Sequence, residues 1–499
     1  MASGEKKATS AGVFPLGLAL TMAGATLLRL YRLTAESLWF DEAYAVAFAA
    51  RPLRDFSPFR LEGPPYTDRN LYHLLLHFWL GLGREDFTIR LLSVIIGVLS
   101  VLGIYLLARE LFDRKVALWS GVLLAVSPLH VWYSQEARMY VLVTMFSLFS
   151  CYFLLRGFRT GRKRDWGALL FCTVAGLYTH TFSVFVVLFQ GVYVLYLLGT
   201  AKISKKQLWT WLGTEVMVGV LALPLLRGLL SQQSQGWWAW IDVRYGSTGL
   251  GDLVDTLLAF SYGTTFGGGR AWLWGGALVA ALVVLMGIGS LRIDKAGIVV
   301  RIPFEGSVVF CLLYLLLPLG TVFVISQVRN MYVLRYLLPF LPPLVILMAR
   351  GVARAKLVPW RIILAGALLL VTARSLQVAY REQQKEDWRG LAQALESSVG
   401  SDDLIFVVDA DCVIPLRHYY HRETDLRLVW RGLVDEAELA ALAEEAASGY
   451  EGVWVVFSHT VNKKLAEALD AREDLVRMGE EHFAGGVDLV SYRVAKAGG

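Results

Sequence analysis

The sequence predicts a mainly α-helical protein that crosses a membrane many times and ends in a small exterior α/β domain. The 499-residue chain is 56% hydrophobic and 18% charged, whereas a soluble protein carries about 25% charged residues. Its apolar residues form long runs of the length that a membrane span needs. Residues 381–499 instead hold 13 Lys and Arg against 23 Asp and Glu. The predicted domains are therefore 1–380 in the membrane and 381–499 outside it.

We expect about 11 transmembrane helices. They cover residues 13–33, 88–107, 116–132, 140–157, 166–180, 182–199, 208–229, 271–291, 307–326, 333–349 and 360–379. Lysine and arginine collect in alternate short loops, beginning with Lys6 and Lys7 and ending with Arg350, Arg354 and Lys356. Because basic loops stay in the cytoplasm, the N-terminus lies inside and the C-terminal domain outside. The basic excess thus follows membrane topology and gives no reason to expect a nucleic acid.

The C-terminal stretch alternates between helical and strand patterns, which is typical of a layered α/β domain. An amphipathic helix is expected from Glu386 to about Ser398. An alanine-rich helix and a third helix are expected after it. Apolar runs predict the strands. The expected helices are 386–398, 435–447 and 461–471, and the expected strands are 404–408, 426–430, 453–457 and 489–494. No G-x-G-x-x-G follows a strand, so nucleotide binding is not indicated.

Two adjacent carboxylates, Asp41 and Glu42, follow the first predicted span within an aromatic stretch. Partial removal from water at the membrane interface raises the pKa of a carboxyl group, which suits a general base. The alternative is that Asp41 caps the N-terminus of a short interfacial helix over Ala43–Ala50. The residue types alone leave both interpretations open.

Three other stretches on the predicted outer side hold candidate site residues. The turn Tyr133–Tyr140 contains Glu136 and Arg138, which either shape a site or only compensate each other. His180 lies in the turn after the fifth span. It either belongs to a site or is an ordinary interfacial histidine whose hydrogen bonds are satisfied. Arg335 enters the tenth span, and its planar guanidinium suits a phosphate. Alternatively, the Arg335 side chain extends toward lipid headgroups and has no role in a site.

His73 and His77 have the i, i+4 spacing that puts two ligands on one face of a helix. The glutamate of a zinc-protease motif is absent beside them, so they are weak metal candidates. The sequence establishes no cofactor. A divalent metal such as Mg²⁺, Mn²⁺ or Ca²⁺ is the one candidate, because carboxylates and histidines could bind it.

Several motifs resemble one class of enzyme. The stretch LWFDEAYAVAFA is similar to the first outer loop of bacterial membrane glycosyltransferases of the GT-C class. The segments VWYSQEARMYVL, LYTHTFS and VLRYLLPFLPPLVIL resemble later parts of the same enzymes, and EDWRGLAQAL resembles the start of their exterior domain. The family they indicate is related to dolichyl-phosphate-mannose protein mannosyltransferases and to aminoarabinose transferases of lipid A, as in glycosyltransferase family 39.

The resemblance implies a site and a reaction. Such enzymes pass a sugar, hexosyl or pentosyl, from a polyprenyl phosphate or pyrophosphate to an acceptor glycan, lipid or protein at the outer face of the cytoplasmic membrane. It implies that Asp41 is the catalytic base and that Glu42 assists it. The phosphate would be held by Arg335, Arg138, His180 and Tyr336. The residues that would shape the site are Tyr133, Gln135, Glu136, Asp68 and Arg69. The family's Pro-Pro motif before the second span is displaced to Pro64-Pro65, which puts Asp68 and Arg69 in doubt.

The chemistry agrees with this implication. Direct displacement at the anomeric carbon needs a base for the acceptor hydroxyl and cations for the departing phosphate, and it inverts the anomeric configuration. Two other classes of function remain open. A flippase or transporter of lipid-linked glycans would show broken spans with charges near mid-membrane. A protein that only binds a lipid carrier would show no turnover.

Overall fold

A computed structural model describes residues 16–56, 70–233, 246–263, 270–294, 297–301, 305–355, 358–429, 436–458 and 463–495. The chain forms two compact units. We call Met1–Tyr31, Ser93–Gln135 and Met139–Leu376 the helical unit, and Arg32–Leu92, Glu136–Arg138 and Gln377–Gly499 the mixed unit. The mixed unit therefore combines the first loop, three residues of the second loop and the C-terminal stretch.

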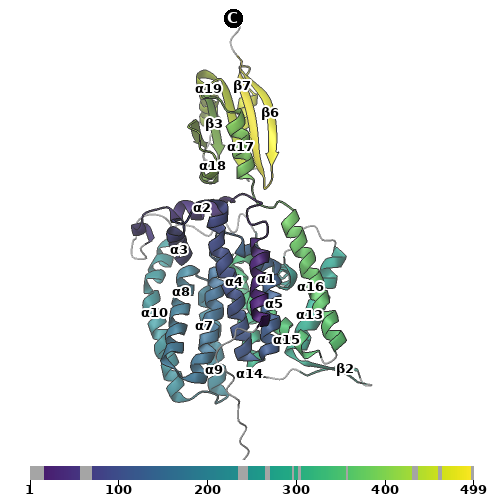
Figure 1. Ribbon diagram of the computed structural model, residues 1–499. Coiled ribbons are helices and arrows are strands. Elements are labelled where there is room, and N and C mark those ends of the chain that lie inside the picture. The colour runs from purple at the N-terminus through teal and green to yellow at the C-terminus, as the bar shows by residue number, and fades with distance from the viewer. Residues whose placement is uncertain are drawn as a thin grey trace, which may run out of the picture. The chain divides into compact units, whose positions relative to one another are not determined.

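The helical unit is a bundle in which α7 and α8 run side by side (Figure 1). Helix α4 begins in the mixed unit, and helix α16 ends in it. A hairpin of β1 (Ser290–Asp294) and β2 (Gly297–Arg301) follows α13. The helices are α1 (Leu16–Leu30), α4 (Asp86–Leu111), α5 (Arg114–Val126), α6 (Pro128–Ser134), α7 (Tyr140–Thr160), α8 (Lys163–Thr179), α9 (Ser183–Gly199), α10 (Lys205–Gln233), α12 (Leu250–Tyr262), α13 (Arg270–Ile288), α14 (Gly306–Ser326), the 3₁₀ helix η3 (Leu334–Phe340), α15 (Leu341–Arg354) and α16 (Val358–Arg381).

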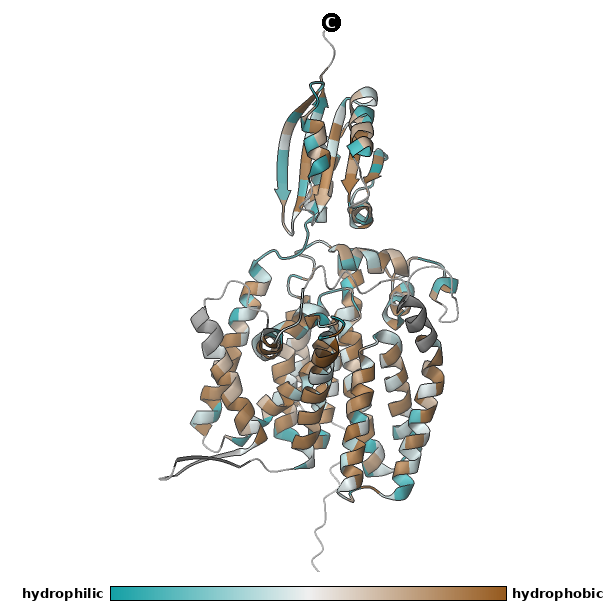
Figure 2. Cartoon of the chain, turned by 180° about the vertical axis from the view of Figure 1, so that it is seen from behind, coloured by the Kyte–Doolittle hydropathy of each residue, from teal (hydrophilic) through white to brown (hydrophobic). Residues whose placement is uncertain are grey.

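The helices confirm a multi-pass membrane protein. Among the described residues, six helical segments are long and apolar enough to cross a bilayer, and the bent pair α5–α6 makes a seventh. Hydrophobic residues cover most of these helices (Figure 2). Helix α10 exposes Trp209, Val216 and Leu223, which is favourable only against lipid. All eleven apolar stretches predicted from the sequence overlap helices, whereas their number as complete spans stays a prediction.

The bend of 60° between α5 and α6 is stabilised by a buried arginine. Pro128 begins α6 and cannot continue the hydrogen bonding of α5. The Arg29 guanidinium donates to the Ala125 carbonyl at 3.0 Å, and another of its nitrogens lies 2.8 Å from His130 Nδ1. Because a guanidinium only donates, the His130 Nδ1 atom accepts. Arg29 thus binds a carbonyl that the break leaves without a helical partner.

The mixed unit contains a five-stranded sheet in the order β4-β3-β5-β7-β6. Strands β4, β3 and β5 are parallel, and β7 is antiparallel to both β5 and β6. The first loop adds three short helices. The strands are β3 (Asp403–Val408), β4 (Asp425–Val429), β5 (Gly452–Ser458), β6 (Leu475–Phe483) and β7 (Val487–Val494), and the helices are α2 (Phe40–Ala49), η1 (Leu53–Phe56), α3 (Leu71–Trp79), α17 (Trp388–Ser398), η4 (Ala410–Cys412), α18 (Val413–Tyr419), α19 (Glu436–Gly449) and α20 (Lys464–Asp470).

Helices cover both faces of this sheet, which confirms the predicted α/β layers. Trp388 of α17 and Leu416 of α18 pack on one face against Ile405. Leu439 of α19 and the α20 residues pack on the other face, against the side chains that alternate with Ile405 along β3. Strand β3 is buried on both sides, as a central parallel strand requires. The outermost strand, β6, is hydrophilic for most of its length (Figure 2).

Helices α13 and α15 approach so closely that only glycine fits at their crossing. A Cβ atom on Gly351 would collide with the Val283 carbonyl oxygen, and one on Gly287 would collide with the Leu347 carbonyl oxygen. We expect Gly351→Ala to destabilise the protein by about 1–3 kcal/mol, because the packed backbones must separate. Thermal unfolding in detergent measures this loss. The control Gly366→Ala on α16 has nothing within 4 Å of its new methyl group, and an equal loss there would contradict the explanation.

Candidate functional site

Asp41 and Glu42 lie in the first turn of α2, where the positive end of the helix dipole favours carboxylates. The N-cap residue is Trp39, and its side chain makes no capping hydrogen bond. The alternative in which Asp41 caps the helix is therefore wrong. Adjacent residues of a helix point about 100° apart, so the two carboxylates have different surroundings.

Glu42 is completely buried and forms a two-pronged ion pair with Arg90 of α4. Arg90 Nε lies 2.8 Å from Glu42 Oε1, and Arg90 Nη2 lies 2.6 Å from Glu42 Oε2. Glu42 also accepts a hydrogen bond from the Ala137 backbone N–H at 2.9 Å. The remaining Arg90 N–H groups donate to the carbonyls of Leu33, Glu36 and Ser37, each at 2.8 Å. One buried pair therefore ties α2, α4, the first loop and the second loop together.

This environment keeps Glu42 ionised. Burial by itself would raise the pKa of the Glu42 carboxyl group, but the positive charges of Arg90 and Lys385 lower that pKa to about 2. Lys385 Nζ lies 3.2 Å from Glu42 Oε2. A carboxylate whose oxygens are already bound to two cations is a poor acceptor for a substrate proton. The structure thus favours an anchoring role for Glu42.

Asp41 is more accessible than its neighbour. Its side chain is 19% exposed, against 0% for Glu42. Arg138 Nη2 lies 3.8 Å from Asp41 Oδ2, and Arg138 Nη1 donates to the Asp41 carbonyl oxygen at 3.1 Å. The contact with Arg138 orients the carboxylate, and the Asp41 side chain stays partly exposed. Of the two predicted catalytic residues, Asp41 is the more exposed.

The second-loop residues Glu136 and Arg138 have partners on other segments. Glu136 Oε1 lies 3.7 Å from Lys385 Nζ, and Arg138 contacts Asp41 as described. Their charges are therefore tied to the first loop and to the C-terminal stretch, beyond any compensation within the turn. Gln135, just before them, belongs to the helical unit and donates to the carbonyls of Arg29 and Tyr31, both at 2.9 Å. Gln135 thus fixes the end of α6 to the end of α1.

The remaining predicted phosphate-binding residues form an aromatic group in the helical unit. The Tyr336 ring centre lies 4.9 Å from that of His180 and 6.2 Å from that of Tyr140. Tyr133 packs edge-on against Tyr140 at 5.3 Å. The Arg335 guanidinium carbon lies 5.8 Å from the Tyr336 ring centre. The structure therefore brings together His180, Arg335 and Tyr336, although His180 is far from the other two in the sequence.

His180 also has a defined tautomer. Its Nδ1 atom accepts a hydrogen bond from the Phe182 backbone N–H at 3.1 Å. A neutral imidazole that accepts at Nδ1 carries its proton at Nε2. Together with the Arg335 guanidinium and the Tyr336 hydroxyl, this part of the helical unit offers hydrogen-bond donors suited to a phosphate.

The predicted metal candidates His73 and His77 lie in α3. His77 Nδ1 lies 2.7 Å from the Ala49 carbonyl oxygen, and His73 packs against Phe48. The oxygens of Glu42 are bound to Arg90, Lys385 and Ala137. Within the described residues, Asp41, Glu42, His73 and His77 do not form a group of three or more ligands whose atoms lie within 4.8 Å of one another. The predicted site residues Asp68 and Arg69 lie outside the described part of the chain.

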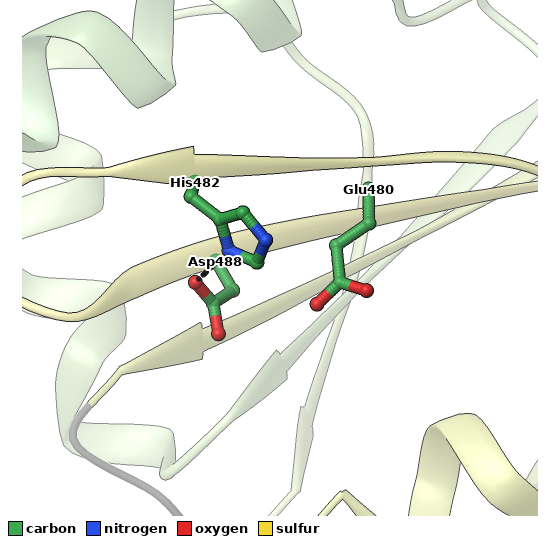
Figure 3. Close-up of side chains that lie close together, drawn as sticks. All are labelled: Glu480, His482 and Asp488. Atoms are coloured by element: carbon green, nitrogen blue, oxygen red, sulfur yellow. Dashed lines mark hydrogen bonds and ion pairs between the residues drawn. The ribbon is translucent and has the colours of Figure 1, made fainter.

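A separate His and carboxylate group lies on β6 and β7. Glu480, His482 and Asp488 are, within the described residues, the group whose potential ligand atoms come within 4.8 Å of one another (Figure 3). Lys463 Nζ lies 2.6 Å from Glu480 and 3.1 Å from Asp488. His482 is 2.8 Å from Asp488. The group is thus a surface ion-pair network with its own cation.

Two partners of Glu42, Arg90 and Lys385, were not predicted from the sequence. Arg90 carries a charge inside the second predicted span, where charges are costly and mark function, so that signal was present in the sequence. Lys385 gave no signal, because a lysine in a polar stretch is ordinary. Arg389 and Tyr419 were missed as well; each contacts Asp86, at 2.5 and 2.7 Å.

Solved structures share the fold of this chain. ArnT from Cupriavidus metallidurans in the apo state matches with a TM-score of 0.59 and 13% identity, over 95% of this chain and 97% of ArnT. The structure of the same protein bound to undecaprenyl phosphate matches with 0.57 and 14%, over 97% and 99%. An oligosaccharyltransferase from Archaeoglobus fulgidus, in complex with zinc and sulfate, matches with 0.54 and 11%, over 88% and 67%. The chain has the GT-C fold.

The match to a sequence family covers less of the chain than the structural matches do. Residues 71–226 match the profile of the family described as dolichyl-phosphate-mannose-protein mannosyltransferase. No curated protein matches the chain. The profile and the fold together confirm the resemblance to GT-C glycosyltransferases that the motifs indicated.

We expect Glu42→Gln to destabilise the protein by about 3–5 kcal/mol at pH 7, because it leaves Arg90 and Lys385 without a full counter-charge. The folded-state pKa of Glu42 is about 2, below its ordinary value of 4.5. Its stabilisation is therefore complete above pH 4.5 and is lost as the pH falls toward 2. Denaturant unfolding of both proteins from about pH 7 to about pH 3 should show their difference shrinking. Exposed Glu467 supplies the control, Glu467→Gln. A difference that does not depend on pH would contradict the ion-pair role.

Proposed function

We propose that this protein is a glycosyltransferase that moves a hexosyl or pentosyl group from a polyprenyl phosphate or pyrophosphate to an acceptor at the outer face of the cytoplasmic membrane. The observation that carries the proposal is the unequal state of the two first-loop carboxylates. Glu42 is held as a permanent anion, while Asp41 beside it stays partly exposed next to Arg138. The GT-C fold supplies the class of reaction. The acceptor is a glycan, a lipid or a protein.

In the proposed reaction the acceptor hydroxyl oxygen attacks the anomeric carbon of the donor sugar. Asp41 takes the hydroxyl proton as the new bond between carbon and oxygen forms. The bond from the anomeric carbon to the phosphate oxygen breaks, and its electron pair leaves with the polyprenyl phosphate. A single displacement of this kind inverts the anomeric centre.

The leaving phosphate needs positive charge and hydrogen-bond donors. We assign this role to Arg335, His180 and Tyr336, which the helical unit groups within ring contact. Arg138 is assigned to orient Asp41 and to add positive charge near the phosphate. The binding of undecaprenyl phosphate by ArnT, whose fold this chain shares, supports these assignments.

We expect Asp41→Asn to lower sugar transfer by about 10²- to 10⁴-fold, the usual contribution of a general base. The amide keeps the shape of the side chain, so thermal stability should change little. The assay uses full-length protein in liposomes with radiolabelled polyprenyl-phosphate sugars. Glu85→Gln removes an exposed first-loop carboxylate and serves as the control. Wild-type activity in the Asp41→Asn variant would rule out the base assignment. A wild-type protein that binds or flips the donor without transfer would contradict the enzyme itself.

We expect Arg335→Ala to raise the KM for the donor by about 10- to 100-fold, because a hydrogen bond to a charged phosphate contributes about 1.5–3 kcal/mol. Arg329→Ala removes an arginine six positions earlier in the same outer stretch and should leave the KM within about twofold. Steady-state kinetics at varied donor concentration separates the two variants. An unchanged KM in Arg335→Ala would show that the arginine only reaches toward lipid headgroups.

A further inference from the structure

A lysine of the C-terminal stretch enters the carboxylate cluster of the first loop. Lys385 lies in the segment between α16 and α17 and is only 8% exposed. Its Nζ atom lies 3.2 Å from Glu42 Oε2 and 3.7 Å from Glu136 Oε1. A buried lysine is rare unless it is paired, because the loss of hydration must be offset. Here it is placed between two buried carboxylates from different loops.

The four buried charges balance. Glu42 and Glu136 contribute two negative charges, and Arg90 and Lys385 contribute two positive ones. Loss of Lys385 would leave the remaining three groups with a net negative charge in an environment shielded from water, where charges interact strongly. Asp41 directly precedes Glu42 in the chain. An added negative charge near it would make its own ionised form less favourable.

The position of Lys385 is determined by the C-terminal sheet and by the first loop. The Glu386 carbonyl accepts from the Ser37 hydroxyl at 2.6 Å, and the Glu386 carboxylate accepts from the Phe40 backbone N–H at 3.0 Å. On the other side, the Asp387 N–H donates to the Ala484 carbonyl in the β6–β7 turn at 3.0 Å. Gly485 of that turn packs against the Glu386 backbone without room for a Cβ atom. The lysine therefore reaches the cluster only when the sheet is folded.

We propose that Lys385 is a positioning residue, through which the folded C-terminal sheet keeps the carboxylate cluster neutral beside Asp41. The sheet thus becomes a required part of the site. This inference rests on the proposed function for its kinetic readout. Other charged or titratable groups on the elements around α2 stay constant in the test. They include Arg138 beside Asp41, Glu386 at the first N–H group of α2, Glu36 beside the Lys385 backbone, and His73 and His77 of α3. Asp86, Arg389, His418 and Tyr419 form a further group where α4, α17 and α18 meet.

The experiment compares Lys385→Met with the double variant Lys385→Met/Glu136→Gln, in which the cluster is neutral again. The matched control is Lys463→Met, which also removes a lysine paired with two carboxylates, but one that is 36% exposed. We expect Lys385→Met to move the acidic limb of the pH–rate profile upward by about one pH unit, so that transfer at a pH on that limb slows by up to about tenfold. The double variant should recover most of the rate and the original limb. Lys463→Met should match the wild type.

Two kinetic outcomes would overturn the proposal. A pH profile unchanged in Lys385→Met would show that the charge of the lysine does not influence the base. A higher donor KM with unchanged kcat and pH profile would make Lys385 a direct phosphate ligand instead. Failure of the double variant to recover would also contradict the charge-balance argument.

Thermal unfolding of the same variants tests the cluster without any transfer assay. Lys385→Met should lower the Tm, and adding Glu136→Gln should restore part of the loss, because the two residues share one charge balance. Additive losses would overturn the pairing. If the wild type transfers no sugar while the unfolding data show recovery, the proposed function fails and the charge balance stands.

Discussion

A carboxylate and a guanidinium buried together, Glu42 and Arg90, hold the first loop, α2 and the start of α4 in place. Each loses its hydration, and only good geometry with further hydrogen bonds offsets that cost. The pair has such geometry, with two short contacts between the side chains and three backbone carbonyls around the guanidinium. The first loop can meet these requirements in few conformations. The position of Asp41, one residue before Glu42, is a consequence of that restriction.

The same pair explains how two neighbouring carboxylates acquire different properties. A base must release and accept protons near neutral pH, whereas an anchor must keep its charge. Glu42 is surrounded by cations that lower its pKa, and Asp41 has a long contact with Arg138 and remains partly exposed. Since neighbouring helical residues diverge by about 100°, the two carboxylates have different surroundings within one turn of α2. Sequence adjacency therefore does not imply shared function.

The sequence predicted what depends on local pattern. Apolar runs located the helices of the membrane body, and Leu404–Val408 predicted the central strand β3 correctly. Strand β6 was missed because it is an edge strand with mostly exposed, charged residues, so no apolar alternation marks it. In the site, the chemistry of Asp41 drew attention to α2. The partners of Glu42 could not be predicted, because Arg90 lies 48 residues away and Lys385 lies 343 residues away. Only the fold brings them together.

The separation of Glu42 and Lys385 has a consequence for biosynthesis. A ribosome adds about 5–20 residues per second, so Lys385 is made about 20–70 s after Glu42, given the 343 positions between them. During that interval the nascent first loop has Arg90 but lacks its second cation and the sheet that carries it. The loop therefore reaches its final electrostatic state only after the last strands have folded. A chain interrupted before that point would be inserted in the membrane with an incomplete acidic site.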